Sequence, residues 1–273
     1  MRVGISGWTY PPWRGVFYPP GLPHRLELEH AAGLLSTIEI NGSFYALQRP
    51  ESYQAWRART PADFLFSVKG GRFVTHLKKL RDVATPLANF FASGVLALGP
   101  KLGPVLWQLP PNLGFDPARI DDFLALLPRT TAAAAALAAG HDERLEGRAY
   151  PTTDADRPLR HAMEVRHPSY ETTAFTDLLR AHDVAVVTAD TAGKWPMFLE
   201  PTTDHLAYVR LHGEEELYAS GYDDDSLDRW AGRVAGWRDE GRDVLVYFDN
   251  DVKVRAPVDA QALAARLGVT PAR

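Results

Sequence analysis

The sequence of 273 residues contains no cysteine. Disulfides, thiolate nucleophiles and cysteine-ligated zinc sites are therefore excluded. An excess of basic charge is also lacking, because 30 lysines and arginines stand against 34 aspartates and glutamates, which gives a formal net charge of −4 at pH 7. This balance gives no global indication of a nucleic-acid partner, although a local basic patch stays compatible with one.

Long apolar runs are missing as well. No run of about 18 apolar residues occurs, and the start MRVGISGW lacks the apolar segment of a signal peptide. We therefore expect no membrane span and a cytoplasmic location. The nucleotide-binding patterns GxGxxG and GxxxxGK[ST] and the metal-binding patterns HxH and HExxH are also absent. No nucleotide cofactor is predicted, and the cofactor stays unassigned.

Short apolar runs alternate with longer amphipathic stretches along the chain. Runs rich in Val, Ile, Leu, Phe and Tyr have the length of strands, and they cover residues 3–6, 37–41, 64–69, 105–109, 162–166, 184–190, 206–212 and 244–250. Helices are expected at 27–35, 50–59, 85–98, 117–127, 173–182, 225–240 and 259–267, with Asp225 as the N-cap of the sixth.

Eight strands, each followed by a crossover element, predict an α/β fold, a single (β/α)8 barrel of the TIM type. The length suits one such domain over residues 1–273. A doubly wound open sheet is the alternative, but it would normally carry a glycine-rich turn after its first strand. Two segments are irregular: residues 7–23 predict an ordered loop rich in aromatics and proline after strand one, and residues 130–160 predict an inserted helix and loop before strand five.

Polar residues occur at the carboxyl ends of nearly all the predicted strands. In a barrel of this type those ends form the active site, and residues two apart share a face of a strand. The side chains concerned are Glu39, Asn41, Lys69, Gln108, Glu164, Arg166, Asp190, Arg210, His212, Asp249 and Asn250. We expect them to form one ligand site. The alternative is a buried ion-pair lattice under a loop, since an unpaired buried charge is costly.

The carboxylates and the cations of this site are expected to have different roles. Glu164, Glu39 and Asp190 are the candidates for acid–base catalysis. Arg166, Arg210 and Lys69 can offset them and bind an anion, because a guanidinium can grip a carboxylate or phosphate with two hydrogen bonds. Further substrate contacts are expected from Asn41, Tyr45, Gln108, His212, Asp249, Asn250 and Trp8. The similar numbers of cations and carboxylates favour an organic anion over a divalent metal, so no metal ligands are predicted.

Two glycines follow the lysine of strand three in KGGRFVTH, residues 69–76. Adjacent glycines can present backbone N–H groups as a nest for an anion. An ordinary glycine turn is the alternative. His167, which faces away from Arg166 and precedes a proline, is expected to be a turn residue.

Several blocks of sequence resemble the signature blocks of the YecE-like barrels, also called domain of unknown function 72. The blocks are SGWTYPPWRGVFYP (6–19), EINGSFY (39–45), FSVKGGRFVTH (66–76), GPVLWQLPP (103–111), MEVRHPSY (163–170), VVTAD (186–190), AYVRLHG (207–213) and YFDND (247–251). The resemblance covers nearly the whole chain and implies a TIM-barrel fold. Asp249 stands where the family usually has Asn, and Gly42-Ser43 where it often has Ser-Thr. The resemblance implies no reaction, because the family's biochemical role is unassigned.

Three functions are compatible with these residues. The first is an enzyme acting on a small anionic substrate, such as a sugar, a sugar phosphate or a nucleotide fragment, with the choice among hydrolase, isomerase and lyase left open. The second is a nucleic-acid-binding or processing protein, suggested by the basic residues Arg72, Lys78, Lys79 and Arg81. The third is a non-catalytic ligand sensor that uses the same pocket. The oligomeric state is not predicted.

Overall fold

In the computed structural model, which describes all 273 residues, eight parallel strands form a closed barrel in the order β1 to β8. Their bounds are β1 Arg2–Ser6, β2 Thr37–Ile40, β3 Leu65–Lys69, β4 Leu102–Gln108, β5 His161–Glu164, β6 Ala185–Asp190, β7 Leu206–Leu211 and β8 Asp243–Phe248. The predicted (β/α)8 barrel is confirmed. Each predicted strand corresponds to one of these elements, with ends that differ by a few residues.

Helices occur in every connection between consecutive strands except the one between β6 and β7. Their bounds are α1 Glu27–Ala32, α2 Gly42–Tyr45, α3 Pro50–Ala58, α4 Ala84–Ala92, α5 Pro117–Ala125, α6 Thr131–Ala138, α7 Thr173–Ala181, α8 Asp224–Asp239 and α9 Arg255–Leu267. Asp223, and not Asp225, caps α8, because its carboxylate accepts a hydrogen bond from the backbone N–H of Ser226 at 2.8 Å. Asp224 and Asp225 instead occupy the first turn, where the helix dipole favours carboxylates.

The chain divides into two compact units. Unit 1 comprises Met1–Glu39, Thr60–Phe64 and Ala185–Arg273, and unit 2 comprises Ile40–Arg59 and Leu65–Val184. Strands β6, β7, β8, β1 and β2 therefore belong to unit 1, apart from the last residue of β2, and β3, β4 and β5 belong to unit 2.

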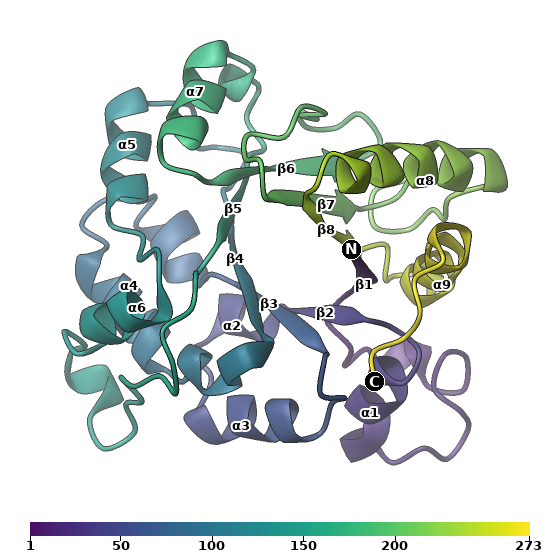
Figure 1. Cartoon of the computed structure of the whole chain (residues 1–273), viewed down its shortest axis with the longest axis horizontal. Coiled ribbons are helices and arrows are strands. Elements are labelled where there is room, and N and C mark those ends of the chain that lie inside the picture. Colours follow the sequence, from purple (N-terminus) through teal and green to yellow (C-terminus); the bar gives the residue numbers. More distant parts are fainter. The chain divides into compact units, whose positions relative to one another are not determined.

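In unit 1, α8 and α9 lie side by side and pack against β8 and β1 (Figure 1). The inner side of α8 buries Leu227, Trp230, Val234 and Trp237, whose spacing of three and four residues places them on one helix face. The predicted ordered loop is present between β1 and α1. Its side chains Trp13 and Tyr18 are fully buried, and the indole N–H of Trp13 donates to the carbonyl of Asp251 at 3.0 Å.

In unit 2, Trp107 on β4 organises the core. Its indole N–H donates to Nδ1 of His161 at 3.1 Å, and Nε2 of His161 lies 2.8 Å from the carbonyl of Pro128. Because Nδ1 accepts, Nε2 carries the proton and the ring is neutral. Burial lowers the pKa of His161 to about 3, which agrees with this state.

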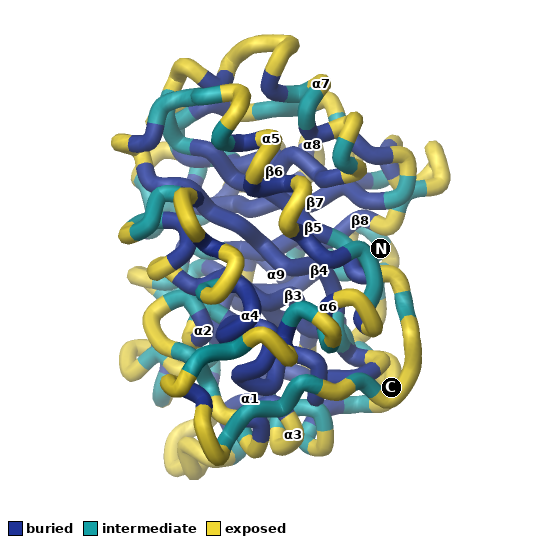
Figure 2. The backbone as a smooth tube through the Cα atoms, turned by 90° about the vertical axis from the view of Figure 1, so that its left-hand side faces the viewer, coloured by how far each residue is buried: buried dark blue, intermediate teal, exposed yellow.

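Burial follows the strands in both units. Figure 2 shows the strands as buried and the exposed residues on loops and on the outer turns of helices. The predicted insertion before β5 consists of α6, a short 3-10 helix at Glu143–Leu145 and an irregular segment. Tyr150 ties it to α4 by donating its backbone N–H to the carbonyl of Ala92 at 2.7 Å.

Candidate functional site

Polar side chains at the strand ends form two clusters, one in each unit. The Arg210 cluster in unit 1 consists of Ser6, Glu39, Tyr208, Arg210, His212 and Asp249. The Lys69 cluster in unit 2 consists of Phe44, Lys69, His76, Gln108, Glu164 and Arg166. Eight of the predicted site residues therefore lie in one cluster or the other.

Arg210 on β7 is a fully buried cation with two carboxylate partners. Its Nη2 lies 2.9 Å from Oε1 of Glu39 and 3.0 Å from Oδ2 of Asp249. Glu39 is also fully buried, and it accepts further hydrogen bonds from the hydroxyls of Ser6 at 3.0 Å and Tyr208 at 2.6 Å. The expected pairing of Glu39 with Arg210 is present. These contacts fix the guanidinium in place, while its role as a substrate ligand stays a prediction.

The tautomer of His212 follows from its neighbours. Nη1 of Arg210 lies 3.3 Å from Nε2 of His212, and a guanidinium can only donate, so Nε2 is the acceptor. Nδ1 then carries the proton and faces Oδ2 of Asp249 at 3.0 Å. A neutral imidazole therefore joins the buried arginine to Asp249, whose side chain is 14% exposed and is the solvent-accessible end of this chain of contacts.

Asp251 is a functional candidate that the sequence reasoning did not select. Burial and, next, repulsion from Asp249 raise the pKa of Asp251 to about 6, although a hydrogen bond from Tyr10 opposes the change. A carboxyl group that titrates close to neutral pH is suited to proton transfer. The signal was present in the sequence, because Asp251 stands two residues after Asp249.

Three of the other predicted site residues have partners outside the two clusters. Burial raises the pKa of Asp190, whose carboxylate takes hydrogen bonds from Tyr222 and Trp230. The amide of Asn250 donates to the carbonyl of Ser220 at 2.9 Å and to Asp259 at 2.8 Å. Trp8 is half-buried and its carbonyl accepts the hydroxyl proton of Tyr18.

Asn41 follows β2 and begins the turn that leads to Phe44, because its carbonyl accepts the backbone N–H of Phe44 at 3.1 Å. Its side-chain Oδ1 is buried and has no hydrogen-bond partner. A buried acceptor without a donor is costly. The role of Asn41 as a substrate contact stays a prediction, for which this acceptor is available.

The Lys69 cluster joins side chains of β3, β4 and β5 to Phe44 of α2 and His76 of the turn after β3. Nζ of Lys69 lies 4.5 Å from the centroid of the Phe44 ring, and the edge of the His76 ring packs against Phe44 with centroids 5.0 Å apart. The register places Gln108 of β4 opposite Glu164 of β5.

The side chains of β4 and β5 continue these contacts. Nε2 of Gln108 lies 3.5 Å from Nε2 of His76. Nε of Arg166 binds Oε1 of Glu164 at 2.8 Å, and the Glu164 side chain is only 1% exposed. The acid and the base in MEVRHPSY are therefore ion-paired, and the carboxylate holds the guanidinium in position.

The charges around His76 give the Lys69 cluster a positive field. Burial first, and then the charges of Lys69, Arg166 and Arg72, lower the pKa of His76 to about 4, and Glu164 only partly opposes them. Three cations against one carboxylate favour an anion at this position. The Arg210 cluster has the opposite balance, because Glu39, Asp249 and the nearby Asp251 surround a single arginine.

Of the two alternatives for the glycine pair after β3, an anion nest and an ordinary glycine turn, the nest is not formed at Gly70. The N–H of Gly70 is taken by the carbonyl of Leu106 at 2.8 Å. A Cβ at Gly70 would lie 2.3 Å from the Trp107 ring, so this position needs glycine for packing. The nest prediction is therefore wrong at Gly70. The expectation for His167 is confirmed, since its ring accepts the backbone N–H of Ser169 and caps a short turn.

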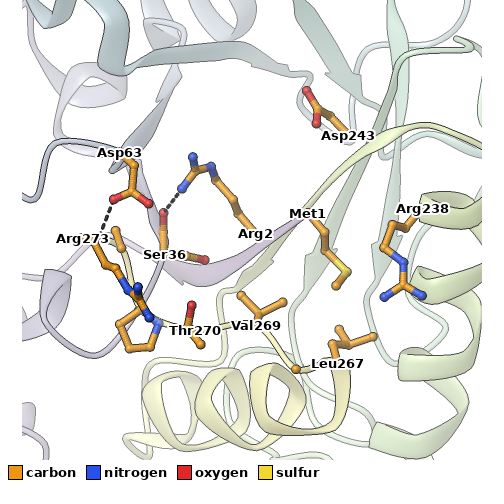
Figure 3. Close-up of a pocket in the computed structure, with 13 residues that line it drawn as sticks. Met1, Arg2, Ser36, Asp63, Arg238, Asp243, Leu267, Val269, Thr270 and Arg273 are labelled. Carbon is orange, nitrogen blue, oxygen red and sulfur yellow. Dashed lines mark hydrogen bonds between the residues drawn. The ribbon is translucent and has the colours of Figure 1, made fainter.

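A separate cavity of about 480 Å³ lies at the amino-terminal ends of β1 and β8 in unit 1 (Figure 3). Arg2 donates to the carbonyl of Ser36 there at 3.1 Å, and Asp63 accepts the backbone N–H of Arg273. Barrels of this type carry their active sites at the other ends of the strands. We therefore do not assign catalysis to this cavity.

No group of three or more His, Asp or Glu side chains lies close enough together to hold a metal ion. No helix combines the length and the apolar character that crossing a membrane requires.

The family model described as "Protein of unknown function DUF72" matches residues 2–273. Among curated relatives, the UPF0759 protein YecE of Escherichia coli K12 is 30% identical over 114 residues, which are 42% of this chain and 39% of YecE. The match thus spans about two fifths of the length of that relative. The UPF0759 protein YunF of Bacillus subtilis is 23% identical over 283 residues, covering 92% of this chain and 89% of YunF.

Two solved structures share the fold. A DUF72 family protein from Thermotoga maritima matches with a TM-score of 0.77 and 24% identity, covering 98% of both chains. One from Enterococcus faecalis matches with a TM-score of 0.75 and 15% identity, covering 98% of this chain and 96% of the other. At these identities the likeness establishes the barrel and carries no activity.

Proposed function

Since the chain belongs to the DUF72 family, whose description assigns no activity, we propose a function from its own residues: an enzyme that binds a small organic anion at the Lys69 cluster and acts on it by acid–base chemistry. The observation that carries this proposal is the excess of cations around His76. Lys69 and Arg166 are 8% and 10% exposed, so an anion bound by them would be largely shielded from water. Charge–charge attraction is stronger in such a shielded site than in water.

His76 and Glu164 are the proposed acid–base groups. With a pKa of about 4, the imidazole of His76 is neutral in the free protein at neutral pH. A bound anion would offset the charges of Lys69, Arg166 and Arg72 and raise that pKa, so that His76 would gain proton affinity when the substrate arrives. Glu164 is the proposed proton acceptor, and its ion pair with Arg166 holds it in position.

Binding can be tested with inorganic phosphate and with a panel of phosphate and carboxylate compounds, by thermal shift and calorimetry. A compound at about 100 times its Kd should add about 2.7 kcal/mol of stability. We expect Lys69→Ala and Arg166→Ala to weaken binding at least tenfold, on the order of 1.4 kcal/mol. Arg81→Ala is the matched control, since Arg81 is an exposed cation of the same unit outside the cluster. Equal binding by all three variants would refute the proposed site.

Turnover separates the enzyme from a sensor. Glu164→Gln keeps the shape of the side chain and removes its basicity. If a ligand is found, an enzyme should still bind it in this variant but lose most of its turnover. Binding that is never accompanied by conversion of the ligand in the wild-type protein would instead favour a sensor.

The nucleic-acid alternative rests on the basic residues Arg72, Lys78, Lys79 and Arg81 together with the exposed rings of Tyr45 and Phe73. It predicts that affinity for short single strands falls steeply with salt and that Arg81→Ala weakens it. No binding to oligonucleotides near physiological salt would exclude this alternative.

A further inference from the structure

A groove of about 400 Å³ lies in unit 2 between α2, the π-helical turn Phe73–Leu77 and α4. Its volume falls in the usual range of small-molecule sites, about 300–1,000 Å³. Three large apolar side chains that line it are open to solvent: Tyr45 is 69% exposed, Phe73 44% and Leu77 61%. Such a concentration of exposed apolar surface is typical of a binding site.

The polar groups of the groove are few and mostly engaged. The hydroxyl of Ser43 donates to the carbonyls of Lys69 at 2.6 Å and Ile40 at 3.0 Å, and Oδ1 of Asn89 accepts the backbone N–H of Asp142 at 3.0 Å. A ligand rich in hydroxyl groups would find few partners here, and it would lose hydrogen bonds to water. The lining therefore suits an apolar group.

The charges of the groove are positive only. No carboxylate lines it, whereas Arg72 and Arg144 do. The guanidinium of Arg144 lies 5.9 Å from the centroid of the Phe73 ring and is paired with Asp142 at 3.1 Å. Arg72, by contrast, has no ion-pair partner, and its charge also acts on His76. A flat ring between such cations and aromatic side chains would be favoured by stacking and cation–π contacts.

One side chain belongs both to the groove and to the Lys69 cluster. The ring of Phe44 lines the groove and is also the ring that Lys69 and His76 contact. A ligand whose charged group contacted Lys69 would therefore lie next to the apolar groove, with only the Phe44 ring between them.

We propose, on the basis of the function inferred above, that the substrate is an organic anion with a flat, aromatic or otherwise apolar portion, and that this portion binds in the groove formed by Tyr45, Phe73 and Leu77 while the anionic group binds the Lys69 cluster. This narrows the substrate class away from hydroxyl-rich sugar phosphates.

Phenyl phosphate and methyl phosphate form a matched pair of probes, because they share the anionic group and differ in the apolar portion. Calorimetry on the full chain should show that phenyl phosphate binds about tenfold or more tightly than methyl phosphate, as expected from burial of the ring. Leu77→Asn, which adds no charge near His76, should abolish this preference and leave the affinity for methyl phosphate within about twofold, since an exposed surface change usually leaves the fold intact. Leu126→Asn, a change at an exposed leucine of the same unit outside the groove, should keep the preference.

The outcomes separate the two proposals. If methyl phosphate binds and the phenyl group adds nothing, the groove inference fails and the anion site stands. If neither probe binds, and no other compound of the panel does, both the proposed function and the groove inference fail. A change of sedimentation on Leu77→Asn, with no change in probe preference, would mark the groove as a contact between copies of the chain and would overturn the inference.

Discussion

Nη2 of Arg210 lies 2.9 Å from Oε1 of Glu39, and both side chains are completely buried. Two opposite charges withdrawn from water must be held by their partners, because either one alone would be strongly destabilising. Here Ser6, Tyr208 and Asp249 complete the arrangement.

Removal of this arginine should therefore be costly. We expect Arg210→Met to lower the free energy of unfolding by about 3–5 kcal/mol, because it leaves carboxylates buried without a counter-charge. Urea unfolding measures the loss. The double variant Glu39→Gln/Arg210→Met should recover part of it. As a control, Arg180→Met removes an exposed pair with Asp177 and should cost less than about 1 kcal/mol. A similar loss of unfolding free energy in Arg210→Met and Arg180→Met would contradict the role of burial.

The two glycines after β3 should respond differently to the same change. Gly70→Ala places a methyl group 2.3 Å from the Trp107 ring, whereas a Cβ at Gly71 would meet nothing nearer than the Ser43 carbonyl at 3.7 Å. We expect Gly70→Ala to destabilise the protein by about 1–3 kcal/mol through overpacking. Gly71→Ala should stay near the wild-type value in the same thermal or urea unfolding experiment. Equal effects would show that the close approach to Trp107 does not govern stability.

Asp251 should make stability fall as the pH rises. Its pKa is raised from 3.8 to about 6 on folding, so its contribution is complete below about pH 3.8 and is lost as the pH rises through 6. Asp251→Asn removes the charge. Relative to the wild type, this variant should be more stable at about pH 8 than at about pH 4, by on the order of 1–2 kcal/mol after allowance for solvent screening. Urea unfolding at the two pH values measures this, and a difference that did not change with pH would show that Asp251 titrates normally.

His76 should titrate differently with and without an anion. Sulfate is a useful probe because its own charge is constant over this pH range. NMR of the histidine ring should give a pKa of about 4 in the free protein and a higher value with sulfate bound at the Lys69 cluster. By linkage, sulfate should bind more tightly as the pH falls from above the bound pKa towards 4. The signals of the exposed His24 should not respond to sulfate. A pKa of His76 that sulfate left unchanged would place the anion elsewhere.

Much of the barrel was predictable because each strand is a short, nearly continuous apolar run, as expected for strands buried on both faces. The runs ending in VVTAD and YVRLH correspond to β6 and β7. Helix ends were less predictable, since Asp223, Asp224 and Asp225 are chemically alike and only the backbone conformation at Asp223 decides which one is the cap.

The partners of the charged residues were only partly predictable. Glu164 and Arg166 pair because they are two residues apart on one side of the chain, a relation that the sequence contains. Asp190 instead takes donors from Tyr222 and Trp230, which come from a loop and from α8, and no local pattern encodes that contact. The requirement for glycine at position 70 depends in the same way on Trp107, which is distant in sequence.

Phe44 stands between the charged groups of the Lys69 cluster and the apolar side chains of the groove. In the proposed site the Phe44 ring separates the anion-binding cluster from the groove. Its size therefore sets the distance between the anionic group and the apolar portion of a ligand that fits both. A smaller residue there would merge the two compartments and loosen the ammonium group of Lys69 at the same time. In the proposed site, recognition of the anionic group and recognition of ligand length would therefore be coupled through Phe44.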